Sequence, residues 1–195
     1  KKISTIDMRL ILVFIVLTSF VGLCSGALTV LQQLLDRNDY NLKWKYGTAQ
    51  TIKWITIHNT ANSAPAQNEA TYLNNRRDSQ YISFHYAVDN IHAIQLLPDN
   101  IHGWHAGDGS GEGNKASIGV EIAQSTNTNE ALKNAAIENG ARLAALLLKR
   151  YNFGVDRLRK HQDWSGKNCP HDILGRYGWT NFVNLVQQKL NTGDY

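Results

Sequence analysis

Short stretches in which hydrophobic and polar residues alternate recur along the chain, and this alternation is typical of β-strands with one buried face. In residues 53–58 (KWITIH), the two isoleucines fall on one face, whereas Trp54, Thr56 and His58 fall on the other. Further strands are predicted at 83–89, 92–97 and 117–123, the first two joined by a turn at Asp89 and Asn90. These strands would supply a sheet.

Other stretches have the spacing of amphipathic helices. The clearest is 129–151, where apolar residues from Leu132 to Leu147 recur on one side of the predicted helix. Shorter helices are predicted at 67–77 and 180–190, the latter with its apolar residues facing inward. Because strands and helices interleave, we expect an α/β (α+β) fold with a central mixed β-sheet flanked by helices.

Composition indicates one globular domain. The chain has 195 residues, of which 43% are hydrophobic, and it shows no internal repeat or low-complexity linker. Its 20 lysines and arginines against 16 acidic residues give a net charge of +4, but the basic residues are scattered, so no nucleic-acid partner is expected. Two cysteines are too few for a disulfide-stapled miniprotein. We expect a monomer.

The N-terminal segment differs from the rest of the chain. Residues 10–23 are almost wholly apolar, Arg9 precedes them, and the small residues of Cys24–Gly26 follow. This order is typical of a secretory signal peptide, and the apolar run is short for a transmembrane helix. We therefore predict an N-terminal extension and signal peptide over 1–26, one folded domain over 27–195, and a secreted product without stable membrane association after cleavage. The alternatives are a buried strand and an uncleaved anchor.

Two polar residues interrupt the apolar strands. Glu121 lies within the stretch 117–123, where the aliphatic side chains share one face and Glu121 shares the other with Gly119. An unpartnered buried carboxylate is costly, so this position indicates either a chemical role or a solvated strand face. His58 ends its strand and precedes Asn59; a hydrogen-bonded structural histidine is the alternative interpretation there.

The segment 161–171 (HQDWSGKNCPH) places His161 and Cys169 eight positions apart. Imidazole nitrogen and thiolate sulfur are zinc ligands, and catalytic zinc sites use three protein ligands. His161 and Cys169 would supply two ligands, and His58 at the end of its strand is well placed to supply the third. The spacing matches no regular zinc finger. In a secreted protein, metal ligation would also occupy a thiol that has no disulfide partner.

Several segments together carry a family resemblance: TIHNTAN (56–62), SFHYAVD (83–89), GWHAGDGSGEGNKASIGVEIA (103–123) and HQDWSGKNCPH (161–171). In order and spacing they resemble zinc-dependent N-acetylmuramoyl-L-alanine amidases of the amidase-2 type. These enzymes occur in phage endolysins and bacterial autolysins and are related to peptidoglycan recognition proteins. The resemblance implies the mixed sheet with surrounding helices, and bacterial peptidoglycan as the substrate.

The resemblance also implies roles for individual residues. Zn2+ would be held by His58, His161 and Cys169, with Glu121 as the catalytic carboxylate and Lys167 as a second catalytic group. We expect Glu121 to take a proton from water and to deliver it to the departing amine of L-alanine, while the ammonium of Lys167 stabilises the oxyanion. A solvated loop lysine is the alternative interpretation of Lys167.

Substrate contacts are expected from Asn59, Trp104 and His105. The last two belong to the glycine-rich loop 103–113, which would frame the groove; a flexible loop around a buried Trp104 is the alternative. One departure from the family pattern is Phe84, near which some relatives have a catalytic tyrosine. Phenylalanine has no hydroxyl, so proton transfer would fall to the glutamate.

Two other functions remain open at this point. A non-catalytic module could bind peptidoglycan through the same groove, although the presence of all three candidate ligands favours an active enzyme. A cysteine hydrolase with Cys169 as nucleophile and His161 as base is disfavoured, because Pro170 removes a backbone amide that often helps to form an oxyanion site. Structural roles are expected for the remaining histidines that we considered: His85, His92 and His102.

Overall fold

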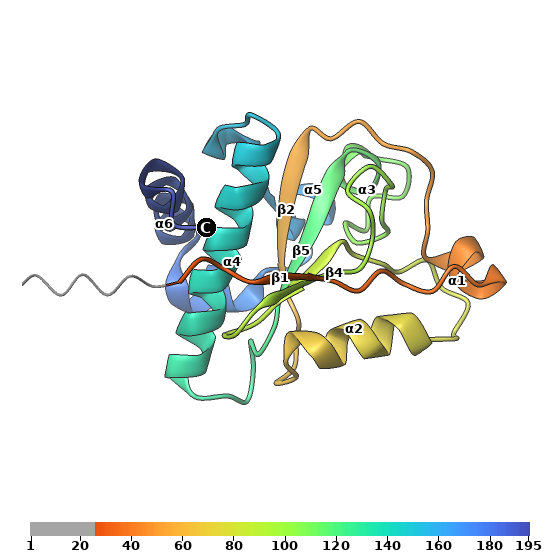
Figure 1. The fold of residues 1–195 in the computed structure, drawn as a ribbon, viewed down its shortest axis with the longest axis horizontal. Helices are drawn as coiled ribbons and strands as arrows, with labels where there is room; N and C mark the ends of the chain where they lie inside the picture. The colour runs from red at the N-terminus through yellow and green to blue at the C-terminus, as the bar shows by residue number, and fades with distance from the viewer. Residues whose placement is uncertain (1–25) are drawn as a thin grey trace, which may run out of the picture.

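A six-stranded β-sheet with helices on both faces forms the centre of the computed structural model, which describes residues 26–195 (Figure 1). Its strands are β1 (Val30–Gln32), β2 (Trp54–Asn59), β3 (Tyr86–Val88), β4 (Ala93–Gln95), β5 (Ser117–Ile122) and β6 (Leu158–Lys160). Their order across the sheet is β1-β4-β3-β5-β2-β6. Strands β3 and β4 pair antiparallel, whereas all other neighbours are parallel. The predicted mixed sheet is therefore confirmed.

Strands β3 to β5 fall in the stretches predicted from the hydrophobic pattern, and β2 does so except that it continues one residue further, to Asn59. The predicted turn between β3 and β4 is also present, because the backbone N–H of Asp89 donates to the carbonyl of His92 at 3.0 Å. The edge strands β1 and β6 are not predicted, since three residues are too few to display an alternation.

The helices are α1 (Asp39–Trp44), α2 (Ala66–Asn75), α3 (Glu112–Lys115), α4 (Glu130–Arg150), α5 (His161–Ser165) and α6 (Trp179–Thr192), with a 3-10 turn η1 (Val155–Arg157) and a π-helical turn η2 (Ile173–Tyr177). The three predicted helices are confirmed as α2, α4 and α6, with slightly different ends. Asn129 starts α4 where expected, because its side-chain oxygen accepts the N–H of Leu132 at 2.9 Å. The helices α1, α3 and α5 have at most six residues, which is too short to show a helical repeat of apolar positions, so the sequence does not predict them.

Helices α4 and α6 lie on one side of the strands and α2 lies on the other (Figure 1). On the first side, Ile55 and Ile57 of β2 are buried against α4, which α6 covers with Phe182 and Val186. On the second side, α2 packs over β3 and β4 and buries Leu73 in a smaller apolar core. Both faces of the sheet centre are thereby shielded from water.

The pairing of β2 with β5 determines where the polar residues meet. The two strands run parallel, with His58 opposite Glu121. Since their aliphatic residues face α4, His58, Glu121 and Gly119 share the opposite face, near the carboxyl ends of the strands, where open α/β sheets bind ligands. Thr56 and Ser117 on this face are fully buried and the side chain of Glu121 is only 18% exposed, so this face is not the solvated strand face that was the alternative for Glu121.

Within the described residues, no helix has the length and apolarity needed to cross a membrane. The predicted signal peptide over 1–26 lies outside these residues except for Gly26. The signal peptide and the domain boundary after it stay predictions.

Candidate metal centre and catalytic cavity

Side chains from separate segments converge at the carboxyl end of β2. The ligand atoms of His58, His161 and Cys169 lie within 4.8 Å of one another. The Nδ1 atoms of His58 and His161 are 3.0 Å apart, and Cys169 Sγ lies 3.8 Å from His58 Nδ1. Tetrahedral coordination with zinc bonds of about 2.0–2.3 Å would place ligand atoms about 3.3–3.6 Å apart. The two separations of 3.0 and 3.8 Å lie on either side of this range, so the three predicted ligands are close enough together to hold one metal ion.

Local chain geometry brings these ligands together. Strand β6 pairs with β2, so His161, which follows β6 directly as the first residue of α5, lies beside the end of β2, where His58 is the last residue but one. Helix α5 stops at Gly166, whose φ of +77° is a left-handed conformation that glycine adopts without strain. The chain then returns, and the N–H of Gln162 donates to the carbonyl of Cys169 at 3.0 Å. The eight positions from His161 to Cys169 are thus spanned by the short helix α5 and by the loop that brings the chain back to its start.

The charge states of the donors fit a metal site. Burial and the neighbouring imidazoles hold the pKa of His58 well below its ordinary value, and burial lowers the pKa of His161 to about 4, so both rings are neutral and keep a lone pair. Burial raises the pKa of the Cys169 thiol to about 12. A divalent cation would reverse that effect, because a coordinating thiol is deprotonated. Two neutral imidazoles and a thiolate form a donor set that suits zinc.

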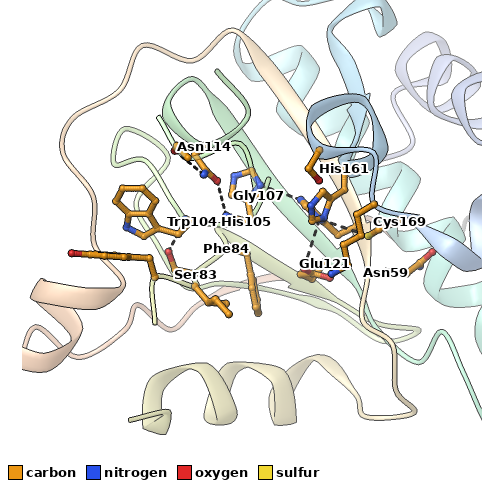
Figure 2. Close-up of a pocket in the computed structure, with 16 residues that line it drawn as sticks. Asn59, Ser83, Phe84, Trp104, His105, Gly107, Asn114, Glu121, His161 and Cys169 are labelled. Atoms are coloured by element: carbon orange, nitrogen blue, oxygen red, sulfur yellow. Dashed lines mark hydrogen bonds and ion pairs between the residues drawn. The ribbon is translucent and has the colours of Figure 1, made fainter. Parts of the chain in front are cut away.

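Glu121 lies next to this cluster, as Figure 2 shows. Its Oε1 atom is 3.9 Å from His58 Nδ1, and its side chain is 18% exposed. Burial, and then the negative charge of Glu69, raise the pKa of Glu121 to about 8, while Lys167 opposes them. A carboxyl group in this range can both accept and donate a proton near neutral pH.

Two adjoining cavities open beside the cluster, and we call them the larger and the smaller cavity. The larger has a volume of about 570 Å³ and the smaller about 370 Å³. Glu121 and Lys167 border both, and Lys167 itself is exposed to solvent. The residues predicted for the site all border the larger cavity: His58, Asn59, Trp104, His105, Glu121, His161, Lys167 and Cys169.

His105 contacts a candidate ligand directly. Its Nδ1 atom is 3.1 Å from Nε2 of His58, the two rings are perpendicular, and both are buried. Gly119 makes this arrangement possible, because a Cβ atom at Gly119 would lie 2.7 Å from the His105 ring. The sequence gives no sign of this contact, which joins a loop to a distant strand. His105 can therefore orient His58 in addition to bordering the cavity.

The loop that carries Trp104 and His105 is braced by side chains. The side-chain oxygen of Asn114 accepts the N–H groups of His105 and Ala106, each at 2.8 Å. The carboxylate of Asp108 in turn accepts the N–H of Asn114 at 3.1 Å. The alternative of a flexible loop does not agree with these bonds. Asn114 is a site residue that the sequence analysis missed.

Of the other predicted site residues, Trp104 forms part of the cavity wall, whereas Asn59 also supports the neighbouring backbone. Trp104 is half-buried at the cavity, on the opposite side of His105 from Cys169 in the view of Figure 2. Asn59 is buried, and its Oδ1 atom accepts the N–H groups of Asp172 and Ile173 at 3.1 and 3.3 Å. Its amide oxygen therefore shapes the turn after Cys169, and substrate contact by Asn59 stays a prediction.

Phe84 borders both cavities, at the position where the sequence departs from the family pattern. His85 is fully buried, and its Nδ1 atom accepts the N–H of Gly119 at 3.0 Å, which agrees with the structural role expected for it. His102 is also buried and packs against Trp104, whereas His92 lies away from the cavities at the β3–β4 turn.

Comparison with known proteins places this arrangement in a family. A family model described as N-acetylmuramoyl-L-alanine amidase (Amidase_2) matches residues 48–172. The chain is 43% identical over 165 residues to N-acetylmuramoyl-L-alanine amidase CwlA of Bacillus subtilis (strain 168), a match that covers 84% of this chain and 59% of CwlA. It is 44% identical over 171 residues to the amidase XlyB of the same organism, covering 86% of this chain and 51% of XlyB. The chain thus spans between half and three-fifths of the length of these relatives.

Solved structures with the same fold support this family assignment. The structure of PlyL matches with a TM-score of 0.76 at 36% identity, covering 82% of this chain and 98% of PlyL. The solution structure of the PlyG catalytic domain matches with a TM-score of 0.75 at 36% identity, covering 86% of this chain and 96% of that domain. The resemblance and the fold predicted from the sequence are confirmed.

Proposed function

The chain belongs to the Amidase_2 family of N-acetylmuramoyl-L-alanine amidases, and from this premise we propose that it hydrolyses the amide bond between N-acetylmuramic acid and L-alanine in bacterial peptidoglycan. The observation that carries the proposal is the convergence of His58, His161 and Cys169 beside Glu121 in one cavity. In the reaction, the amide C–N bond breaks, the lactyl carbonyl becomes a carboxylate and L-alanine gains a free amine.

We propose zinc as the ion held by His58 Nδ1, His161 Nδ1 and Cys169 Sγ. When bound, zinc supplies a Lewis acid that activates water and the lactyl carbonyl group. The protein holds the donors in place: His105 meets the far nitrogen of His58, and the return loop presents the sulfur.

Glu121 performs the proton transfers in this proposal. Its carboxylate accepts a proton from the attacking water and delivers it to the nitrogen of L-alanine as the C–N bond breaks. Lys167 is placed at the same two cavities, where its ammonium stabilises the negative charge on the carbonyl oxygen. Phe84 offers no hydroxyl at the cavity wall, so in this proposal both proton transfers fall to Glu121.

The cavities suit the two parts of the substrate differently. The larger cavity includes the aromatic walls of Tyr81, Phe84 and Trp104, which suit the C–H faces of a saccharide. The smaller cavity includes Asn62 and Glu69, whose polar groups suit a peptide stem. In this proposal His105 and Asn59 border the bond that is cleaved.

A cysteine hydrolase is a poor alternative for this geometry. The Cys169 thiol is buried and its pKa is raised to about 12, whereas a nucleophilic cysteine needs a lowered pKa. Pro170 also lacks the N–H that could stabilise an oxyanion.

The test is product analysis with purified protein and a soluble muramoyl-peptide. An amidase releases peptides with a new N-terminal alanine and produces no new reducing sugar. Activity should disappear on chelation, return with zinc, and be lost in Glu121→Gln. The matched control is Glu130→Gln, which changes an exposed glutamate at the start of α4 and should retain activity. Chelator-resistant hydrolysis, full activity of Glu121→Gln, or binding without hydrolysis in zinc would refute the proposal; the last result would indicate a non-catalytic peptidoglycan-binding module.

We also propose that the protein is secreted after removal of residues 1–26. The support is the basic, apolar and small-residue order of that segment. N-terminal sequencing of the protein recovered from culture medium should begin near residue 27. A product that stays with the membrane and keeps its N-terminal segment would indicate an anchor instead.

A further inference from the structure

A row of aromatic side chains leads from the larger cavity onto the surface of α1. This aromatic row consists of Tyr40, Trp44, Tyr81 and Trp104. Ring centroids are 6.4 Å apart between Tyr40 and Trp44, 4.9 Å between Trp44 and Tyr81, and 4.9 Å between Tyr81 and Trp104. Tyr81 and Trp104 border the cavity, so the row is continuous with the candidate active site.

The row is open to solvent where it leaves the cavity. Tyr81 is 53% exposed and its neighbour Ile82 is 39% exposed, while Tyr40 and Trp44 are half-buried. Exposed apolar side chains that gather beside a cavity mark interaction surfaces more often than scattered ones do.

Tyr40, at the outer end of the row, is held by a hydrogen bond and by the neighbouring Lys45, whose ammonium lies 5.5 Å from its ring. The hydroxyl of Tyr40 accepts the N–H of Ser79, which ties α1 to the loop that carries Tyr81. Lys45 directs its ammonium to the carbonyls of Leu73 and Asn74 at the end of α2. The hydrogen bond of Tyr40 and the ring contacts along the row restrict these side chains before any ligand binds, which reduces the entropy lost on binding.

The chemistry of the row favours a carbohydrate. Pyranose rings present C–H groups that pack on the negative faces of aromatic rings, and their hydroxyls stay at the wet edge. The far end of the row carries cations, because Lys43 lies 4.9 Å from the Trp44 ring and Arg77 lies 4.9 Å from the Tyr40 ring. These cations suit the lactyl carboxylates of muramic acid residues that have no peptide.

We propose that the aromatic row is an extended glycan subsite, which binds the saccharides next to the muramic acid that is being cleaved. The proposal rests on the proposed function, since the polymer would enter the row from the cavity past Trp104. Helix α1, with Tyr40 and Trp44, precedes residues 48–172, which match the family model. The subsite is thus assembled partly by a segment outside the matched region.

The test uses glycan chains of alternating N-acetylglucosamine and N-acetylmuramic acid without peptides, and metal-free protein. Calorimetry should show that affinity rises with chain length until the saccharide spans the row. Tyr81→Ala and Trp44→Ala should each weaken binding of the long chains at least tenfold, whereas Trp44→Phe should restore most of it. The control is Tyr72→Ala, which removes a tyrosine that is 60% exposed on α2 and should bind as the wild type does.

Each outcome is decisive for the subsite. Equal affinity of Trp44→Ala and wild type for long chains, or no rise of affinity with length, would overturn it. A change in self-association on sedimentation without a change in glycan affinity would overturn it in favour of contact between two copies of the chain. Because the ligand has no amide to cleave, failure of the subsite leaves the hydrolysis test untouched. Absence of hydrolysis would likewise leave this binding result standing.

Discussion

Replacement of His105 by leucine tests how His58 is oriented. If His58 Nδ1 binds zinc, Nε2 of the same ring carries a proton and donates it to His105 Nδ1, 3.1 Å away. Leucine has no acceptor, and an unpartnered buried N–H costs about 1–3 kcal/mol. Loss of such a partner typically weakens metal binding by about 10–100-fold, which corresponds to about 1.4–2.8 kcal/mol. The two figures agree, so we expect the zinc dissociation constant of His105→Leu to rise by that factor.

The assay is competition for zinc between metal-free protein and a chromophoric chelator, which needs no catalysis. His105→Asn is the conservative control, because its amide oxygen reaches the place of the ring Nδ1 and should retain most of the affinity. Gly119→Ala should weaken zinc binding without altering any ligand, since its methyl group would lie 2.7 Å from the His105 ring. Wild-type affinity in His105→Leu, or equal loss in the leucine and asparagine variants, would refute the role of His105.

Three further results are expected. Saturating zinc should raise the unfolding free energy of the wild type, by about 2.7 kcal/mol at a hundredfold excess over the dissociation constant, and calorimetry should find no such rise in Cys169→Ser. Asn114→Ala should lower the unfolding free energy by about 2–4 kcal/mol in urea titrations, because two buried N–H groups lose their acceptor; an unchanged midpoint would show that the loop does not need this brace. Burial raises the pKa of Glu69 above its ordinary 4.5, so between these two values the folded protein keeps a proton that the unfolded chain has released. The free energy of unfolding therefore falls as the pH rises from 4.5 through the raised pKa. Metal-free Glu69→Gln should therefore gain stability over the wild type across that window, and a difference independent of pH would contradict the assignment.

Short-range patterns predict the centre of this fold well. The alternation in β2 and β5 places the isoleucines toward α4 and His58 and Glu121 on the opposite face, as the structure has it. The residue types of His161 and Cys169 indicate a metal site before their distance is known. In both cases the information lies within a few consecutive residues.

The rest depends on contacts between distant segments. Strand β6 has only three residues and forms because β2 offers it an edge, yet it sets the position of His161. The bond from His105 to His58 and the space left by Gly119 belong to no local period. Trp44 lies on a six-residue helix that packing stabilises. Features of this kind depend on contacts between distant segments, so they can be identified only in the three-dimensional structure.

Strand β1 has a practical consequence for trimming this protein. It pairs with β4 at the margin of the sheet and lies before residue 48, where the family match begins. A fragment started at 48 would leave the main-chain groups of β4 without partners, which invites pairing with other molecules and aggregation. A fragment stopped at 172 would lack Phe182 and Val186 and bare the apolar side of α4. In a fusion protein, the junctions should therefore lie outside residues 30–192. The product then keeps strand β1, which covers the edge of β4, and helix α6, which covers α4.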